Sequence, residues 1–148
     1  MRFRYRCPLR WSDMDAFGHV NNAVYLRYLE EARIDFTSRL ARQSAPSAFT
    51  GGSVVARHEI DYLRPLTHQH DPVTIEMWVT KLSAASITFA YEIKDAEAEA
   101  AGDGRAGAPY VRASTIVVPY DLEEERPRRL TAEEKSFLEG YIDDSHRG

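Results

Sequence analysis

Cysteine is almost absent from this sequence. Cys7 is the only one among the 148 residues, so no disulfide can form within the chain. A zinc site made of several cysteines is excluded for the same reason. His68 and His70 lie close together but lack a third ligand, and no dinucleotide-binding or phosphate-binding motif occurs. We therefore expect neither a metal ion nor another cofactor.

Long apolar runs and an excess of positive charge are also missing. No segment approaches the roughly 20 apolar residues that cross a bilayer, and residues 1–6 contain no apolar run of signal-peptide length. The formal net charge is −4, from 19 Lys and Arg against 23 Asp and Glu. This balance leaves no overall basic field for nucleic acid or anionic lipid. We expect a cytoplasmic protein that binds neither nucleic acid nor membranes.

The apolar residues that are present follow two periodicities. They make up 43% of the chain, as in a packed globular protein, and the length suits a single domain over residues 1–148. Alternation with a period of two predicts five strands, over residues 3–11, 54–63, 73–80, 87–94 and 109–120. Helical spacing predicts a long helix from about residue 22 to residue 40, with Asn21 or Asn22 as its N-cap. Thr131 is expected to cap a short helix through Phe137.

The order of these elements predicts the fold class. One strand precedes the long helix, and four strands with short connections follow it, residues 95–108 forming a flexible hairpin connection. We expect the four strands to pair as an antiparallel meander and the five-stranded sheet to wrap around the helix, in an α+β hotdog fold. His58, on an apolar strand face, is expected to be a hydrogen-bonded core histidine. A second copy would cover the sheet edges, which predicts a homodimer or a dimer of dimers.

Residues 13–26 carry the chemistry. A loop with a carboxylate at Asp15, a glycine at Gly18 and two asparagines opens directly into the long helix. The first amides of a helix lack internal partners, and the helix dipole makes that end positive, so a carbonyl oxygen can be held there as it becomes an oxyanion. Gly18 has no side chain and allows close approach. These groups are what an acyl-transfer or acyl-hydrolysis site requires.

The segment resembles the active-site loop of the 4-hydroxybenzoyl-CoA thioesterase-like hotdog family, especially its long-chain acyl-CoA thioesterase branch. The shared pattern is Asp-x-x-x-His-Val-Asn-Asn-Ala-x-Tyr-Leu, starting at Asp15, and residues 61–66 are similar to the exit of the family's second strand. The resemblance implies hydrolysis of a fatty or aromatic acyl-CoA to the free acid and CoA. It also implies that Asp15 acts as nucleophile or general base, and that the main-chain N–H of Asn22 polarises the thioester carbonyl.

Other residues in and near this region can have either a functional or a purely structural role. In plant-type acyl-carrier thioesterases an Asn precedes the corresponding His by two positions, but here that position is Phe17, so His19 either takes part in catalysis or only fixes the loop. Asp13 is expected to be a turn former. Candidate substrate contacts are Gly18, Tyr25, Glu30 and Arg64, with core packing or solvent exposure as the alternatives. Arg2, Arg4, Arg6 and Arg10 either form a solvated strand face or meet CoA phosphates or an acyl carrier protein.

Two other functions stay open at this point. A non-catalytic hotdog protein could bind acyl-CoA without turnover, although binding alone needs no carboxylate beside the thioester. An enoyl-CoA hydratase on the same fold would use Asp15 and His19 for proton transfer to carbon. The Asn21-Asn22 helix start fits the thioesterase pattern better than it fits a hydratase.

Overall fold

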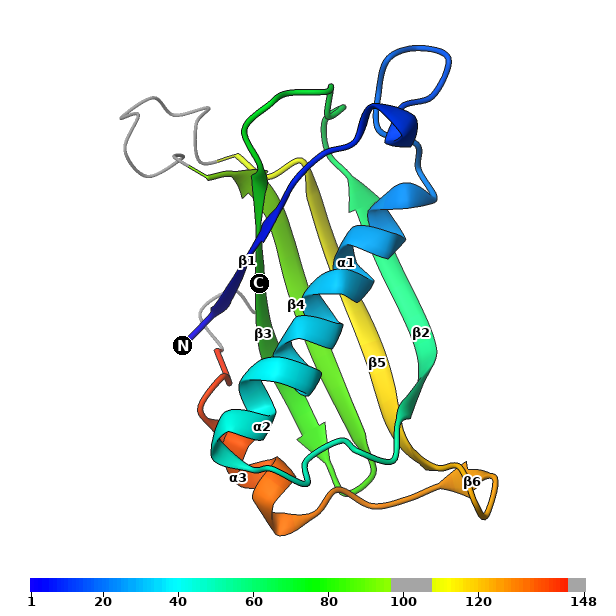
Figure 1. Ribbon diagram of the computed structural model, residues 1–148, viewed down its shortest axis with the longest axis vertical. Coiled ribbons are helices and arrows are strands. Elements are labelled where there is room, and N and C mark those ends of the chain that lie inside the picture. The colour runs from blue at the N-terminus through cyan, green and yellow to red at the C-terminus, as the bar shows by residue number, and fades with distance from the viewer. Residues whose placement is uncertain (97–107, 144–148) are drawn as a thin grey trace.

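A computed structural model describes residues 1–96 and 108–143 of the chain (Figure 1). Its strands are β1 (Phe3–Cys7), β2 (Ser53–Tyr62), β3 (Val73–Ser83), β4 (Ser86–Asp95), β5 (Val111–Asp121) and the short β6 (Arg126–Pro127). Its helices are the 3-10 turn η1 (Trp11–Asp13), α1 (Val24–Ile34), the π-helical segment η2 (Asp35–Leu40), α2 (Ala41–Ser44) and α3 (Ala132–Glu139). Most of the predicted hairpin connection over residues 95–108 lies outside the described residues.

The strands form one antiparallel sheet in the order β1-β3-β4-β5-β2, and β6 pairs only with β5. The predicted meander is correct for β3, β4 and β5. It is wrong for β2, which pairs with the far edge of β5 and not with β3. The reason is that β1 occupies the other edge of β3, so residues 63–72 must carry the chain from one side of the sheet to the other.

The long helix lies against the sheet, as predicted (Figure 1). Tyr25, Leu29, Ala32 and Phe36 are buried and form its apolar stripe. The helical path begins at Val24 and continues through η2 and α2 to Ser44, so it starts later and ends later than predicted. The later start follows from a tight turn, because the N–H of Val24 donates to the carbonyl oxygen of Asn21 (2.9 Å) before the helical pattern begins. The result is the curled antiparallel sheet around one long helix that defines a hotdog fold.

The edge strand β2 is the least covered part of the sheet. All of its residues are exposed except Ile60, which is half-buried. The prediction that His58 is a core residue is therefore wrong, since α1 does not cover this edge. His58 is nevertheless hydrogen-bonded, with Nδ1 2.9 Å from Oγ1 of Thr115. An uncovered edge strand of ten residues is an open template for pairing with another chain.

Cys7, the last residue of β1, belongs to the apolar core. Its side chain is buried, and the thiol has no disulfide partner. Burial and the nearby carboxylate of Asp13 raise the pKa of the Cys7 thiol to about 12. The sulfur is therefore part of the packing, not a reactive nucleophile.

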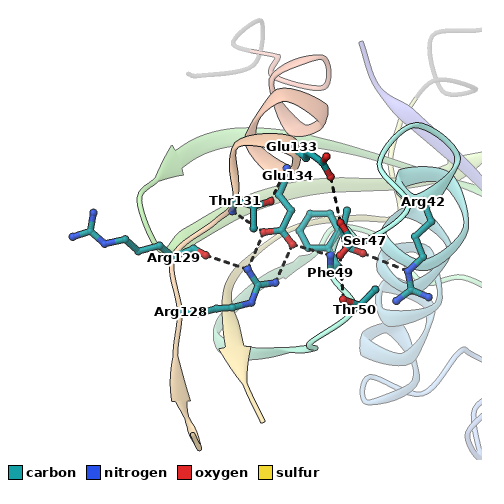
Figure 2. A network of polar contacts seen from close by, with 10 residues as sticks. Arg42, Ser47, Phe49, Thr50, Arg128, Arg129, Thr131, Glu133 and Glu134 are labelled. Atoms are coloured by element: carbon teal, nitrogen blue, oxygen red, sulfur yellow. Dashed lines mark hydrogen bonds and ion pairs between the residues drawn. The ribbon is translucent and has the colours of Figure 1, made fainter. Parts of the chain in front are cut away.

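A buried carboxylate fastens α3 to the rest of the molecule (Figure 2). Thr131 caps the helix as predicted, and its hydroxyl accepts from the N–H of Glu134 (3.1 Å). The carboxylate of Glu134 is 1% exposed and accepts from the guanidinium of Arg128 (2.9 Å) and from the N–H of Phe49 (2.7 Å). Although burial alone would raise it, these bonds lower the pKa of Glu134 to about 2. One ionised side chain thus joins α3 to the loop that follows α2.

Candidate active site

The loop before α1 is folded around the side chain of Asp15. One carboxylate oxygen, Oδ1, accepts from the N–H of Phe17 (2.8 Å) and from the N–H of His19 (3.2 Å). The N–H of Asp15 donates to the carbonyl oxygen of His19 (2.7 Å). Gly18 has a φ of +76°, a conformation that glycine adopts without strain. Asp15 therefore cannot rotate freely, because its own loop holds one of its oxygens.

A second set of contacts fixes this loop to the core. Asp13, only 3% exposed, accepts from the Tyr28 hydroxyl (2.6 Å) and from the guanidinium and N–H of Arg10. The turn-forming role predicted for Asp13 is confirmed by the bond from the Arg10 N–H. On the other side, the N–H of Val20 donates to the carbonyl oxygen of Leu66 (2.8 Å). The loop and residues 63–72 thus lie together at one end of the molecule (Figure 1).

A pocket of about 250 Å³ opens beside Asp15. It is lined by Asp15, His19, Val20, Asn22, Tyr25, Tyr62, Leu63, Arg64 and Pro65. Within the part of the chain that the structure describes, the second carboxylate oxygen of Asp15, Oδ2, has no hydrogen-bond partner. The carboxylate is half-buried, so this oxygen is available to a molecule in the pocket.

Asn22, which also lines this pocket, lies in the turn at the start of α1. The N–H of Ala23 donates to Oδ1 of Asn21 (2.9 Å), and the N–H of Val24 donates to the Asn21 carbonyl oxygen. Asn21 itself donates from its N–H to the carbonyl oxygen of Asp13 (3.0 Å). The N–H of Asn22 has no acceptor among residues 1–96 and 108–143. This amide lies at the positive end of the helix dipole, where a carbonyl oxygen is favourably bound.

Five of the seven predicted site residues meet in this pocket: Asp15, His19, Asn22, Tyr25 and Arg64. Gly18 and Glu30 do not line it. Gly18 lies exposed at the turn of the loop, with open space where a side chain would start, and its positive φ is what this position requires. Glu30 is exposed on α1, further along the helix. Their predicted contacts with substrate stay predictions.

Tyr25 and Arg64 are held in different ways. Tyr25 is 3% exposed, and burial together with the nearby charge of Asp15 raises the pKa of its hydroxyl. Arg64 donates to the carbonyl oxygen of Ala108 (2.8 Å), and its guanidinium lies 3.7 Å from the centre of the Tyr110 ring. Tyr25 is therefore part of the core as well as of the pocket, whereas Arg64 is tied to the segment before β5.

The arginines near the N-terminus are mostly engaged by acidic side chains. Arg2 donates to Glu92 (3.1 Å) and Asp143 (2.9 Å), and its guanidinium lies 3.6 Å from the centre of the Trp78 ring. Its side chain is largely buried, so the reading of this residue as part of a solvated face is wrong. Arg10 pairs with Asp13 (3.1 Å). The guanidinium of Arg2 is therefore engaged within the fold, whereas the Arg10 side chain is 67% exposed, so its predicted alternatives stay predictions.

Four pocket residues were not proposed as site residues from the sequence: Val20, Tyr62, Leu63 and Pro65. Three of them lie within residues 61–66, and the similarity of this segment to the exit of the family's second strand is the signal that identifies them. Among the described residues, no cluster of three or more His, Cys, Asp or Glu side chains is arranged to hold a metal ion. No helix in the described ranges is both long and apolar enough to cross a membrane.

Comparison with known proteins agrees with this architecture. A thioesterase from Thermus thermophilus, solved in complex with coenzyme A and zinc, is 30% identical with a TM-score of 0.71, over 93% of this chain and 92% of the other. YbaW from Escherichia coli, a probable thioesterase, is 25% identical with a TM-score of 0.70, over 97% and 99%. A predicted thioesterase from Bacillus stearothermophilus is 19% identical with a TM-score of 0.78, over 97% and 98%, which bears on the fold alone.

The fold and the loop before α1 thus define a hotdog protein of the thioesterase class. Residues 9–138 match the family model of the thioesterase-like superfamily. The chain belongs to that family, as the residue pattern around Asp15 predicted.

Proposed function

We propose that this protein is an acyl-CoA thioesterase that hydrolyses a fatty or aromatic acyl-CoA to the free acid and CoA. The observation that carries the proposal is that the free Oδ2 of Asp15 and the unbonded N–H of Asn22 belong to residues lining one pocket. Membership of the thioesterase-like superfamily supports the reaction class. The coenzyme A bound to the Thermus thermophilus relative supports the thioester carrier.

In this reaction the Asn22 N–H donates to the thioester carbonyl oxygen and stabilises the negative charge that develops there. Asp15 has two available roles. As a nucleophile, its carboxylate attacks the carbonyl carbon, the C–S bond breaks, CoA leaves as thiolate, and water then hydrolyses the resulting anhydride. As a general base, it takes a proton from a water that attacks the same carbon.

The remaining site residues have supporting roles in the proposal. His19 is half-buried in the pocket and its main chain already fixes the loop, so its imidazole is left to contact substrate. Tyr25 borders the acyl group, Arg64 contacts the CoA part of the substrate, and Gly18, outside the pocket, leaves room for the substrate to approach the loop. Glu30 would approach a substrate from the open side of α1. An acyl carrier protein is the alternative donor of the acyl group.

A second copy of the chain completes the proposed assembly. The open edge β2 carries the exposed apolar side chains Val54, Val55 and Tyr62, and the exposed Leu63 follows it. Pairing of this edge with its copy would join two sheets and bury these residues, which supports a homodimer. Two such dimers could associate further into a tetramer.

The test measures free thiol released from a panel of acyl-CoAs by wild type, Asp15→Ala and Asp15→Asn. We expect both variants to lose about a hundredfold or more in rate, the scale of general acid–base contributions. Asp71→Asn is the matched control, because Asp71 is exposed in the loop before β3 and does not line the pocket. Equal rates for Asp15→Asn and wild type would rule out the proposed role.

Because Asp15 and His19 share the pocket, enoyl-CoA hydration is the second candidate. Incubation with a 2-enoyl-CoA separates the two reactions. Loss of the conjugated absorbance without release of free thiol would identify a hydratase. Tight binding of acyl-CoA with neither signal would identify the non-catalytic alternative.

A further inference from the structure

The side chain of Tyr62 connects the edge strand β2 with the start of α1. Its hydroxyl donates to the main-chain carbonyl oxygen of Asn22 at 2.9 Å. Its ring packs against the ring of Tyr25, with centroids 5.4 Å apart and planes at 62°. Tyr62 is 45% exposed and lines the same pocket as Asp15. It is therefore the side chain through which β2 reaches the turn that carries the open amide.

Two peptide planes meet at Asn22, and the Asn22 N–H lies in the first of them. The plane before it contains the Asn21 carbonyl oxygen, which accepts from the N–H of Val24. The plane after it contains the Asn22 carbonyl oxygen, held by Tyr62, and the N–H of Ala23, held by Asn21. Since a peptide group is planar, the Asn22 N–H turns together with the Asn21 carbonyl oxygen. Tyr62 acts on the next peptide plane and so restrains this N–H through the backbone dihedral angles of Asn22.

Of these three bonds, the one from Tyr62 comes from outside the turn. The other two link residues 21–24 to one another, so they would persist if the turn moved as a unit. The Tyr62 hydroxyl instead ties the turn to the sheet. A donor that acts on a developing oxyanion must be held in place before the reaction, because a shift of about 1 Å is costly to the rate.

We propose that Tyr62 is a positioning residue, whose hydroxyl holds the turn before α1 so that the Asn22 N–H stays directed at the thioester carbonyl oxygen. This inference rests on the proposed thioesterase function and adds to it a residue outside the loop. Tyr62 touches neither the reacting carbon nor the leaving thiol in this scheme. Its effect is therefore expected in kcat and not in KM.

The experiment compares Tyr62→Phe with wild type in kcat, KM and melting temperature, on the acyl-CoA that wild type hydrolyses fastest. Phe keeps the ring contact with Tyr25 and removes only the hydroxyl. We expect kcat to fall about tenfold, less than the hundredfold or more that follows loss of a complete oxyanion donor. KM should stay within about twofold, because uniform binding is unchanged. Tyr120→Phe, on β5 and outside the pocket, is the control.

A second measurement follows the amide itself and needs no turnover. In proton–nitrogen NMR spectra we expect the Asn22 amide to shift and to become more mobile in Tyr62→Phe but not in Tyr120→Phe. An unchanged kcat in Tyr62→Phe, or an unchanged Asn22 amide, would overturn the proposal. So would a fall in kcat that accompanies a changed oligomeric state on size-exclusion chromatography.

The two proposals fail in distinguishable ways. If wild type releases thiol, Asp15→Asn does not, and Tyr62→Phe equals wild type, the thioesterase function stands and the role of Tyr62 is overturned. If wild type releases no thiol from any acyl-CoA, the function itself fails before any Tyr62 variant is measured.

Discussion

The Tyr28 hydroxyl donates a 2.6 Å hydrogen bond to the Asp13 carboxylate, so a residue in the second turn of α1 holds the loop that leads into the same helix. The loop that presents Asp15 is thereby closed at its base by a buried, charge-assisted bond. Such bonds are among the stronger ones in proteins. The geometry of the site therefore depends on Tyr28 and Asp13, although neither residue lines the pocket.

Removal of this bond should destabilise the protein. In Tyr28→Phe the buried Asp13 loses its donor from α1, and we expect a loss of about 2 kcal/mol in the free energy of unfolding, within the range for bonds to charged groups. Urea denaturation at pH 7 measures it. Tyr141→Phe, whose ring packs on Phe36, should change the value by about 0.5 kcal/mol or less. If both substitutions lower the free energy of unfolding equally, the bond from Tyr28 to Asp13 contributes no particular stability.

The Glu134 network predicts how stability depends on pH. The pKa of Glu134 is lowered from 4.5 to about 2 in the folded protein. A lowered pKa means that the contribution is fully present above about pH 4.5 and is lost as the pH falls towards 2. The shift corresponds to about 3 kcal/mol as an upper figure.

To measure this contribution, the free energy of unfolding is compared between pH 6 and pH 3 for wild type and two variants. Glu134→Gln should be less stable than wild type at pH 6, and the difference should shrink at pH 3. Glu133→Gln, at the neighbouring exposed position, should follow the wild-type curve. Parallel curves for wild type and Glu134→Gln would contradict the low pKa.

His19 should matter less than Asp15 for turnover. A thiolate leaves without prior protonation more readily than an alkoxide, because thiols have a pKa of about 8.5, so no strong acid catalyst is required. We expect His19→Ala to lower kcat by about tenfold or less, against about a hundredfold or more for Asp15→Ala. His68→Ala, outside the pocket, is the control. A loss in His19→Ala as large as that in Asp15→Ala would assign the histidine an essential role.

The open edge β2 predicts the assembly. If two copies pair through it, a lysine introduced on this strand should prevent the pairing. We expect wild type to have the mass of a dimer or tetramer in light scattering, and Val55→Lys to shift towards the monomer. Leu122→Lys introduces the same charge at an exposed position beyond β5 and should leave the mass unchanged. A monomeric wild type would refute the proposed homodimer.

The sequence predicted local structure well, but it did not predict which distant strands pair with each other. The loop around Asp15 and the start of α1 lie within one short segment, so their proximity follows from the sequence alone. The place of β2 beyond β5 depends on β1 taking the other edge of β3, a competition between strands that no local pattern records. The exposure of His58 and the arrival of Tyr62 in the pocket both follow from that placement. The sequence therefore predicted the loop that carries Asp15, but not that β2 brings Tyr62 to the same pocket.

The buried Cys7 has a practical consequence for measuring turnover. Colour-forming disulfide reagents react with thiolate, and a thiol with a pKa of about 12 that is shielded by the core supplies almost none at neutral pH. With no other cysteine in the chain, the folded protein contributes no background to such an assay. Every equivalent of colour counts one molecule of CoA set free, and a slow late rise in colour reports unfolding.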